Sequence, residues 1–132
     1  MGVYQFITSR KVVHMYIITL ILELTPETDF KATIDYYEKK IAPASLRISG
    51  IEKINCVQLK STPYNEYDRT PLRNLFYQIQ ISFSSENAVE EALQKPETMK
   101  LIRRFLISSK CNFHWFVGHE QTYYAQLQKE SS

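Results

Sequence analysis

The sequence contains one pattern twice: an apolar strand, an amphipathic helix and a second strand. The first copy spans residues 16–59 and the second spans residues 75–119. Apolar side chains recur with a period of two in the strands and at every third or fourth residue in the helices. Two such units predict an α+β fold, a ferredoxin-like βαββαβ sandwich in which both helices cover one face of an antiparallel sheet.

The first helix shows how firmly this pattern fixes an element. Phe30, Ile34, Tyr37 and Ile41 fall on one helical face, so we expect that face to pack on the sheet. Thr25 or Thr28 is the expected N-cap, Pro43 should end or kink the helix near Ile41, and Gly50 should stop it.

The clearest strand lies at residues 75–83, where apolar and polar residues alternate. Leu75, Tyr77, Ile79, Ile81 and Phe83 form the predicted apolar face, and Phe76, Gln78, Gln80 and Ser82 form the other. Ser84 or Ser85 should cap the helix that follows, and Pro96 suits the first position of a further helical segment.

A chain of 132 residues is the size of one domain. We assign residues 1–14 to an N-terminal extension, 15–119 to the folded domain and 120–132 to a polar tail. Residues 61–74 form a long polar loop, which suits a lid or an interface arm.

Composition excludes several classes of function. The net charge is +2 and no long run of like charges occurs, so we expect no nucleic-acid partner. The apolar run at residues 15–22 is far shorter than the ~20 residues of a membrane-spanning helix, so no membrane partner is expected. Two isolated cysteines, Cys56 and Cys111, indicate free thiols in a reducing compartment, and we predict a cytoplasmic protein.

The sheet face without helices carries further apolar and aromatic residues that need a cover. Neither terminal segment is long enough to provide it. We therefore expect a homodimer through this open sheet face.

Two stretches resemble the EthD-domain proteins of the dimeric α/β barrel superfamily. The first is Tyr37, then Ala42-Pro43, then Ser49-Gly50-Ile51. The second is the strand and turn of residues 76–88, followed by Glu91-Ala92-Leu93 and Pro96-Glu97. The resemblance covers about residues 15–119. It implies a dimeric barrel and a small-molecule function, such as monooxygenase-like oxidation without a tightly bound cofactor or isomerase-like chemistry.

The chain departs from the family pattern at Ile41, where the family usually has a histidine, and at Ser49, where it has a proline. Three hypotheses therefore stand: a protein that acts on or binds an apolar or aromatic compound in a barrel cavity, a non-catalytic dimeric binding or accessory protein, and a haem-binding member of the superfamily.

We select candidate site residues from their chemistry and their places on the predicted elements. The candidate catalytic residues are His114 and Tyr37. The candidate ligand-binding residues are Tyr36, Gln78, Gln80, Trp115 and Arg69. His114 and His119 lie an odd number of residues apart on one strand, so they should point to opposite faces, and we predict no metal site. No cofactor is expected, with haem as the alternative.

Overall fold

The structure is a computed structural model that describes residues 13–60 and 74–125. Four antiparallel strands form one sheet in the order β2-β3-β1-β4. They are β1 (Val13–Glu23), β2 (Ile51–Gln58), β3 (Leu75–Phe83) and β4 (Asn112–Thr122). The helices are α2 (Phe30–Tyr36), η1 (Tyr37–Ile41), α3 (Ala42–Ser45), α4 (Glu86–Gln94) and α5 (Pro96–Ser109). This order and topology confirm the predicted ferredoxin-like α+β sandwich.

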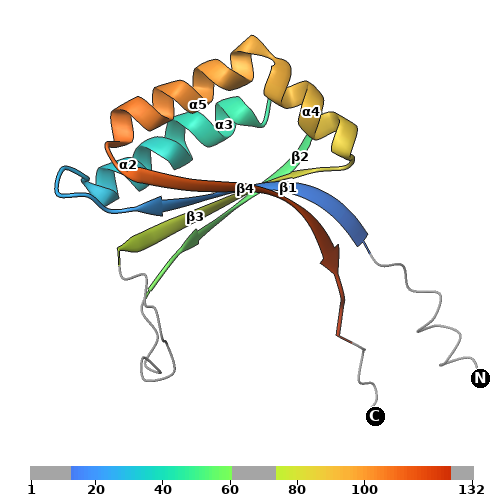
Figure 1. Ribbon diagram of the computed structural model, residues 1–132, viewed down its shortest axis with the longest axis horizontal. Coiled ribbons are helices and arrows are strands. Elements are labelled where there is room, and N and C mark those ends of the chain that lie inside the picture. Colours follow the sequence, from blue (N-terminus) through green and yellow to red (C-terminus); the bar gives the residue numbers. More distant parts are fainter. Residues whose placement is uncertain (1–12, 61–73, 126–132) are drawn as a thin grey trace, which may run out of the picture.

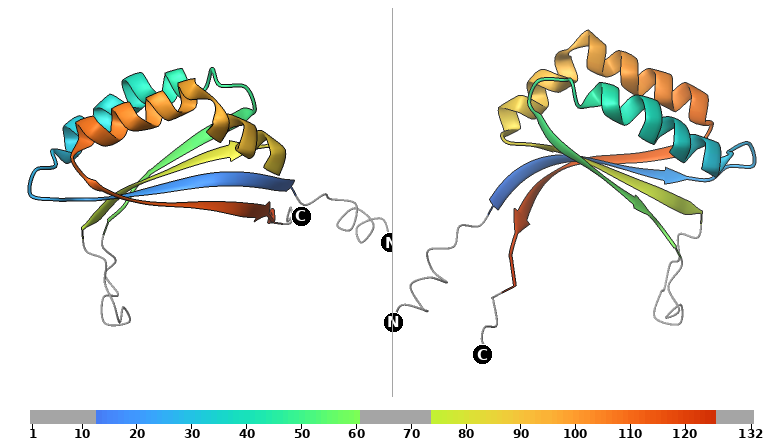
Figure 2. Two further views of the ribbon diagram at one scale, coloured as in Figure 1. Left: turned by 45° about the horizontal axis from the view of Figure 1, so that its top comes forward. Right: turned by 180° about the vertical axis from the view of Figure 1, so that it is seen from behind.

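All helices lie on one side of the sheet, and none of the described elements covers the other side (Figures 1 and 2). Both strand–helix–strand units predicted at residues 16–59 and 75–119 are present, although β1 and β4 extend beyond these bounds. Both long strands pair with each other and extend into the segments that were assigned to the N-terminal extension and the tail. The sequence pattern underestimates them because their outer ends lack strict apolar alternation.

The first helix is one continuous rod of three segments, α2, η1 and α3. Its N-cap is Asp29, whose Oδ1 accepts a hydrogen bond from the Ala32 amide at 3.1 Å. The prediction of Thr25 or Thr28 as N-cap is wrong, because both threonine hydroxyls donate instead to the carbonyl of Lys110, at 2.7 and 2.9 Å. They tie the start of this helix to the end of α5.

Pro43 does not end the helix. The middle segment η1 is a π-helix, in which the Ala42 amide donates to the carbonyl of Tyr37, five residues earlier. Proline lacks the amide hydrogen that a regular α-helix requires, and the wider turn lets the chain pass through Pro43 into α3. Gly50 then makes the turn into β2 with φ of +97°, as the sequence indicates.

The second half of the fold follows the predicted signals closely. Ser85 caps α4 by accepting a hydrogen bond from the Ala88 amide at 3.1 Å, and Pro96 starts α5. The alternation in β3 is broken once, at Phe76. A bulge opposite Leu22 and Glu23 inserts Phe76 as an extra residue, so its ring is buried in the core, with the Phe30 ring centroid 6.4 Å away. The prediction that Phe76 shares a face with Gln78 is therefore wrong.

Candidate functional site

A small cavity of about 40 Å³ lies between the helix layer and the sheet. Its floor comes from β1 and β3, its roof from the first helix and α5, and Trp115 of β4 forms one side. The residues around it are almost all apolar: Ile18, Leu20, Tyr37, Ile41, Ser45, Ile48, Ile51, Ile81, Phe83, Thr98, Leu101, Ile102, Phe105, Leu106 and Trp115.

Two of the residues that line this cavity carry a buried hydroxyl group without a hydrogen-bond partner in the part of the chain that the structure describes. These hydroxyls are Tyr37 Oη and Thr98 Oγ1. Tyr37 is 2% exposed and Thr98 is 8% exposed, so neither residue has much access to bulk water. Buried polar groups in folded proteins nearly always have partners, and an exception calls for an explanation. The pair marks a place where a bound molecule can present a hydrogen-bonding atom.

The ring of Tyr37 is held firmly. The Phe105 ring centroid lies 4.9 Å from it, and the Tyr77 ring packs edge-on at 6.3 Å. Burial raises the pKa of Tyr37 far above its ordinary value, with a smaller contribution from nearby Cys56. The hydroxyl therefore stays protonated at physiological pH and can donate one hydrogen bond and accept others.

Ser45 also lines the cavity, and its hydroxyl already has a hydrogen-bond partner. Ser45 Oγ donates to the carbonyl of Ile41 at 2.8 Å, inside its own helix. Thr98 stands in the first turn of α5, where no side-chain cap is present. Tyr37 and Thr98 thus remain the two groups that can recognise a polar atom in this cavity.

The cavity contains no strong acid or base. Among its described lining residues, Tyr37 is the only one with an ionisable side chain. Ile41, at the position where the EthD pattern has a histidine, is 4% exposed and lies against the cavity. The space is therefore suited to binding a neutral group rather than to transferring protons rapidly.

A second cluster of polar groups joins the first helix to the edge of the sheet. Tyr77 Oη donates to Glu38 Oε2 at 2.5 Å, and Cys56 of β2 lies close to the same hydroxyl. Burial, followed by the bonds to Cys56 and Glu38, raises the pKa of Tyr77. Burial also raises the pKa of the Cys56 thiol, so Cys56 is a weak nucleophile at neutral pH.

The structure brings two of the sequence-predicted site residues together and separates the others. Tyr37 and Trp115 both line the cavity. His114, Gln78 and Gln80 lie on the open face of the sheet, because they pair with Ile21 and Thr19 of β1, whose side chains point away from the helices. Trp115 lies on the helix side of the sheet, because it pairs with the buried Leu20 of β1.

The remaining predicted residues lie elsewhere. His114 Nε2 is 2.7 Å from Glu23 Oε1 at the rim of the sheet. Tyr36 lines a separate depression with Asp29 and Lys110, near the start of the first helix. Arg69 lies outside the described residues. His119 is on the opposite face from His114, as predicted, with its Nε2 3.2 Å from Nδ1 of His14.

Sequence analysis did not select Thr98. A signal was present, because Thr98 precedes Leu101, Ile102 and Phe105 by three, four and seven residues and therefore lies on the apolar stripe of α5. A polar residue on such a stripe indicates either a satisfied core hydroxyl or a binding group, and only the contacts distinguish them.

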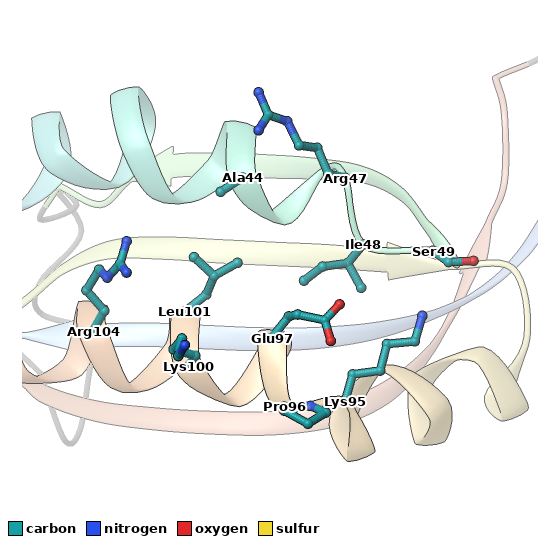
Figure 3. Close-up of a pocket in the computed structure, with 10 residues that line it drawn as sticks. All are labelled: Ala44, Arg47, Ile48, Ser49, Lys95, Pro96, Glu97, Lys100, Leu101 and Arg104. Carbon is teal, nitrogen blue, oxygen red and sulfur yellow. The ribbon is translucent and has the colours of Figure 1, made fainter.

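A larger groove lies directly outside the cavity, between α3 and the start of α5, with a volume of about 550 Å³ (Figure 3). Ile48 and Leu101 line both the groove and the cavity. The groove, which has an ordinary ligand size, and the cavity therefore share a border made by these two side chains.

The described part of the chain has neither a cluster of metal-binding residues nor a helix that could span a membrane. No group of three or more histidine, cysteine or acidic residues is placed to hold a metal ion in residues 13–60 and 74–125. No helix there has the length and apolar character needed to span a membrane.

Comparisons with known proteins show that the chain shares its fold with several solved structures. No family profile matches the chain, and no curated protein matches it. An ethyl tert-butyl ether D (EthD) family protein from Bacillus halodurans has a TM-score of 0.65 and 14% identity, covering 80% of this chain and 98% of its own. Hydroxynitrile lyase from Passiflora edulis has a TM-score of 0.58 and 11% identity, covering 85% and 96%.

A third similar structure is described as dimeric. It is a protein of unknown function with a ferredoxin-like fold from Bacteroides fragilis, with a TM-score of 0.52 and 12% identity, covering 82% of this chain and 96% of its own. At these identities the likeness concerns the fold. This chain shares the ferredoxin-like fold of these proteins, as the sequence analysis predicted.

Proposed function

We propose that this protein binds a small, mostly apolar compound whose single hydroxyl or carbonyl group enters the cavity beneath the first helix. The observation that carries the proposal is the pair of buried hydroxyls without partners, Tyr37 Oη and Thr98 Oγ1. A cavity of about 40 Å³ accommodates one such group, and the adjoining groove of about 550 Å³ accommodates the body of the compound.

Binding can be followed through Trp115, the single tryptophan of the chain, because it lines the cavity. We expect 4-(4-hydroxyphenyl)butanoate to change its fluorescence and to bind more tightly than 4-phenylbutanoate, which lacks the hydroxyl. In the double variant Tyr37→Phe/Thr98→Val this preference should disappear. Tyr36→Phe is the matched control, since Tyr36 lines a different depression. An unchanged preference in the double variant would refute the assignment of the cavity.

Catalysis on the bound compound is the second candidate. The expected chemistry, oxidation or isomerisation without a tightly bound cofactor, would have to use Tyr37, because it is the only ionisable residue among the described residues of the cavity. A hydroxyl whose pKa burial has raised acts as a hydrogen-bond donor rather than as a base. Incubating the bound compound in air and searching for products by mass spectrometry separates this candidate from binding alone.

The haem-binding alternative does not fit this cavity. Haem iron needs an axial histidine, cysteine, methionine or tyrosine, and Tyr37 is the one such residue lining it. The pKa of Tyr37 is raised, which opposes the ionised form that ligates iron. We expect no shift of the Soret band on adding haem.

We also propose that the protein is a homodimer through the open sheet face. Phe116 is 58% exposed on this face, and Val57 and the half-buried Ile17 and Ile21 add apolar surface. The Bacteroides fragilis protein with the same fold is described as dimeric, which supports a dimer.

Phe116→Glu tests the dimer, because it places a charge in the proposed interface and should give a folded monomer in analytical ultracentrifugation. Val117→Glu is the control: Val117 is equally exposed on the same strand but pairs with Ile18 on the opposite face. If both variants sediment as the wild type does, the open face is not the interface.

A further inference from the structure

We infer that the compound bound in this site is an organic anion, whose carboxylate is held by a cluster of basic side chains on the outer groove. This inference rests on the proposed function and adds the charge of the ligand. Four of the groove residues are cations: Arg47, Lys95, Lys100 and Arg104. Glu97 is the one carboxylate among them, so the groove carries three net positive charges, although the whole chain has only +2.

These basic side chains have no acidic partner of their own. None of the four, nor Glu97, forms an ion pair among the described residues, where the ion pairs are Lys39 with Asp35 and His114 with Glu23. Figure 3 shows Arg47, in the turn just after α3, and Arg104, on α5, at opposite sides of the groove, with Lys95 at the end where α5 begins. Uncommitted cations around one concave surface attract an anion, and a low-dielectric wall strengthens that attraction.

The backbone at the start of α5 adds to the positive electrostatic potential of the groove. α5 has 14 residues, and its N-cap, Lys95, provides no side-chain hydrogen bond to the first turn. The amide groups at the start of a helix carry partial positive charge, which favours an anion beside them. Arginine and lysine side chains next to such a helix start are a suitable combination for a carboxylate.

The floor of the groove is apolar and leads inward. Ala44, Ile48, Pro96 and Leu101 supply the apolar part, and Ile48 and Leu101 also border the cavity. Figure 3 shows these two side chains between the helices. A ligand that satisfies the whole site has a neutral oxygen at one end, for Tyr37 and Thr98, an apolar middle, and a carboxylate at the other end.

The test compares 4-(4-hydroxyphenyl)butanoate with its neutral amide, using Trp115 fluorescence on the full-length protein. The acid should bind up to about fivefold more tightly, since one exposed charged contact contributes at most about that factor. Its affinity should fall as salt is added, whereas that of the amide should not.

Two double variants locate the effect. Arg47→Gln/Lys100→Gln removes two groove cations and should abolish most of the preference for the acid. Lys40→Gln/Arg103→Gln removes the same charge from exposed positions that do not line the groove, and should leave the preference intact. Equal binding of acid and amide, or equal effects of the two double variants, would overturn the inference.

The outcomes also separate this inference from the proposed function. If the amide binds as well as the acid and still depends on Tyr37 and Thr98, the cavity assignment stands and the anion site fails. If none of the compounds changes the fluorescence of Trp115, the proposed function itself fails.

Discussion

Replacing Tyr37 by phenylalanine should make the protein more stable, which is unusual for a change at a buried aromatic residue. The substitution keeps the ring and its contacts with Phe105 and Tyr77, and removes only the hydroxyl. That hydroxyl is buried and has no partner among the described residues. An unsatisfied buried polar group costs about 1–3 kcal/mol, so we expect a gain of about 1–2 kcal/mol in the free energy of unfolding.

Urea denaturation followed by circular dichroism measures this gain, and calorimetry should show a rise in the melting temperature of about 3–8 °C. The control Tyr36→Phe alters a partly exposed hydroxyl and should change stability by less than about 0.5 kcal/mol. The slope of the unfolding free energy against urea should be unchanged, because the same surface is exposed on unfolding.

A loss of stability in Tyr37→Phe, with Tyr36→Phe unaffected, would refute this reasoning, because it would mean that the hydroxyl is already satisfied in the free protein. Thr98→Val provides an independent measure of the same effect at the other hydroxyl. If both hydroxyls serve a ligand, the stabilised variants bind it more weakly, so stability and affinity change in opposite directions.

Three further outcomes follow from the same structure. Above pH 10 the free energy of unfolding, measured by urea titration, should fall by about 2.7 kcal/mol per pH unit. The raised pKa values keep Tyr37 and Tyr77 protonated in the folded protein, whereas both tyrosines ionise in the unfolded chain. Tyr37→Phe should halve this slope. Glu38→Gln should speed alkylation of Cys56 at pH 8, since a negative charge that raises the thiol pKa is removed, and an unchanged pH–rate profile would contradict this. Gly50→Ala should cost about 1–3 kcal/mol in urea denaturation, because φ is +97° and an added Cβ lies 3.2 Å from another side chain; a cost below about 0.5 kcal/mol would show that the turn relaxes.

The sequence predicts the fold well because local signals and the overall pattern agree. Strand alternation, Ser85 as a cap, Pro96 at a helix start and Gly50 in a turn each depend on a few neighbouring residues. The errors occur where distant residues decide the outcome. Threonine is a good N-cap residue by type, but the hydroxyl groups of Thr25 and Thr28 donate hydrogen bonds to the carbonyl of Lys110. Lys110 is more than eighty positions away in the chain.

The candidate site is less predictable for the same reason. Periodicity places Tyr37 on the core side of its helix, but it does not show whether the hydroxyl finds a partner there. Periodicity also cannot decide which face of β4 points toward the helices. In the structure Trp115 lies on the helix side and His114 lies on the open face. The site depends on contacts among β1, β3, the first helix and α5, so its recognition requires their packing.

The π-helical turn explains why one face of the first helix can line the cavity from Tyr37 to the end of the helix. Tyr37, Ile41 and Ser45 are spaced by four residues, and in a regular α-helix each such step rotates the side chain by about 40° around the axis. A turn closed by a bond between residues five apart is wider, so residues four apart stay more nearly in line. Pro43, which cannot donate to the carbonyl of Lys39, favours this wider turn. The proline that the sequence suggests as an end or kink of the helix therefore helps to keep one helical face toward the cavity. Tyr37 lies at the start of this face, and Ile48, which also borders the groove, lies just beyond the end of the helix.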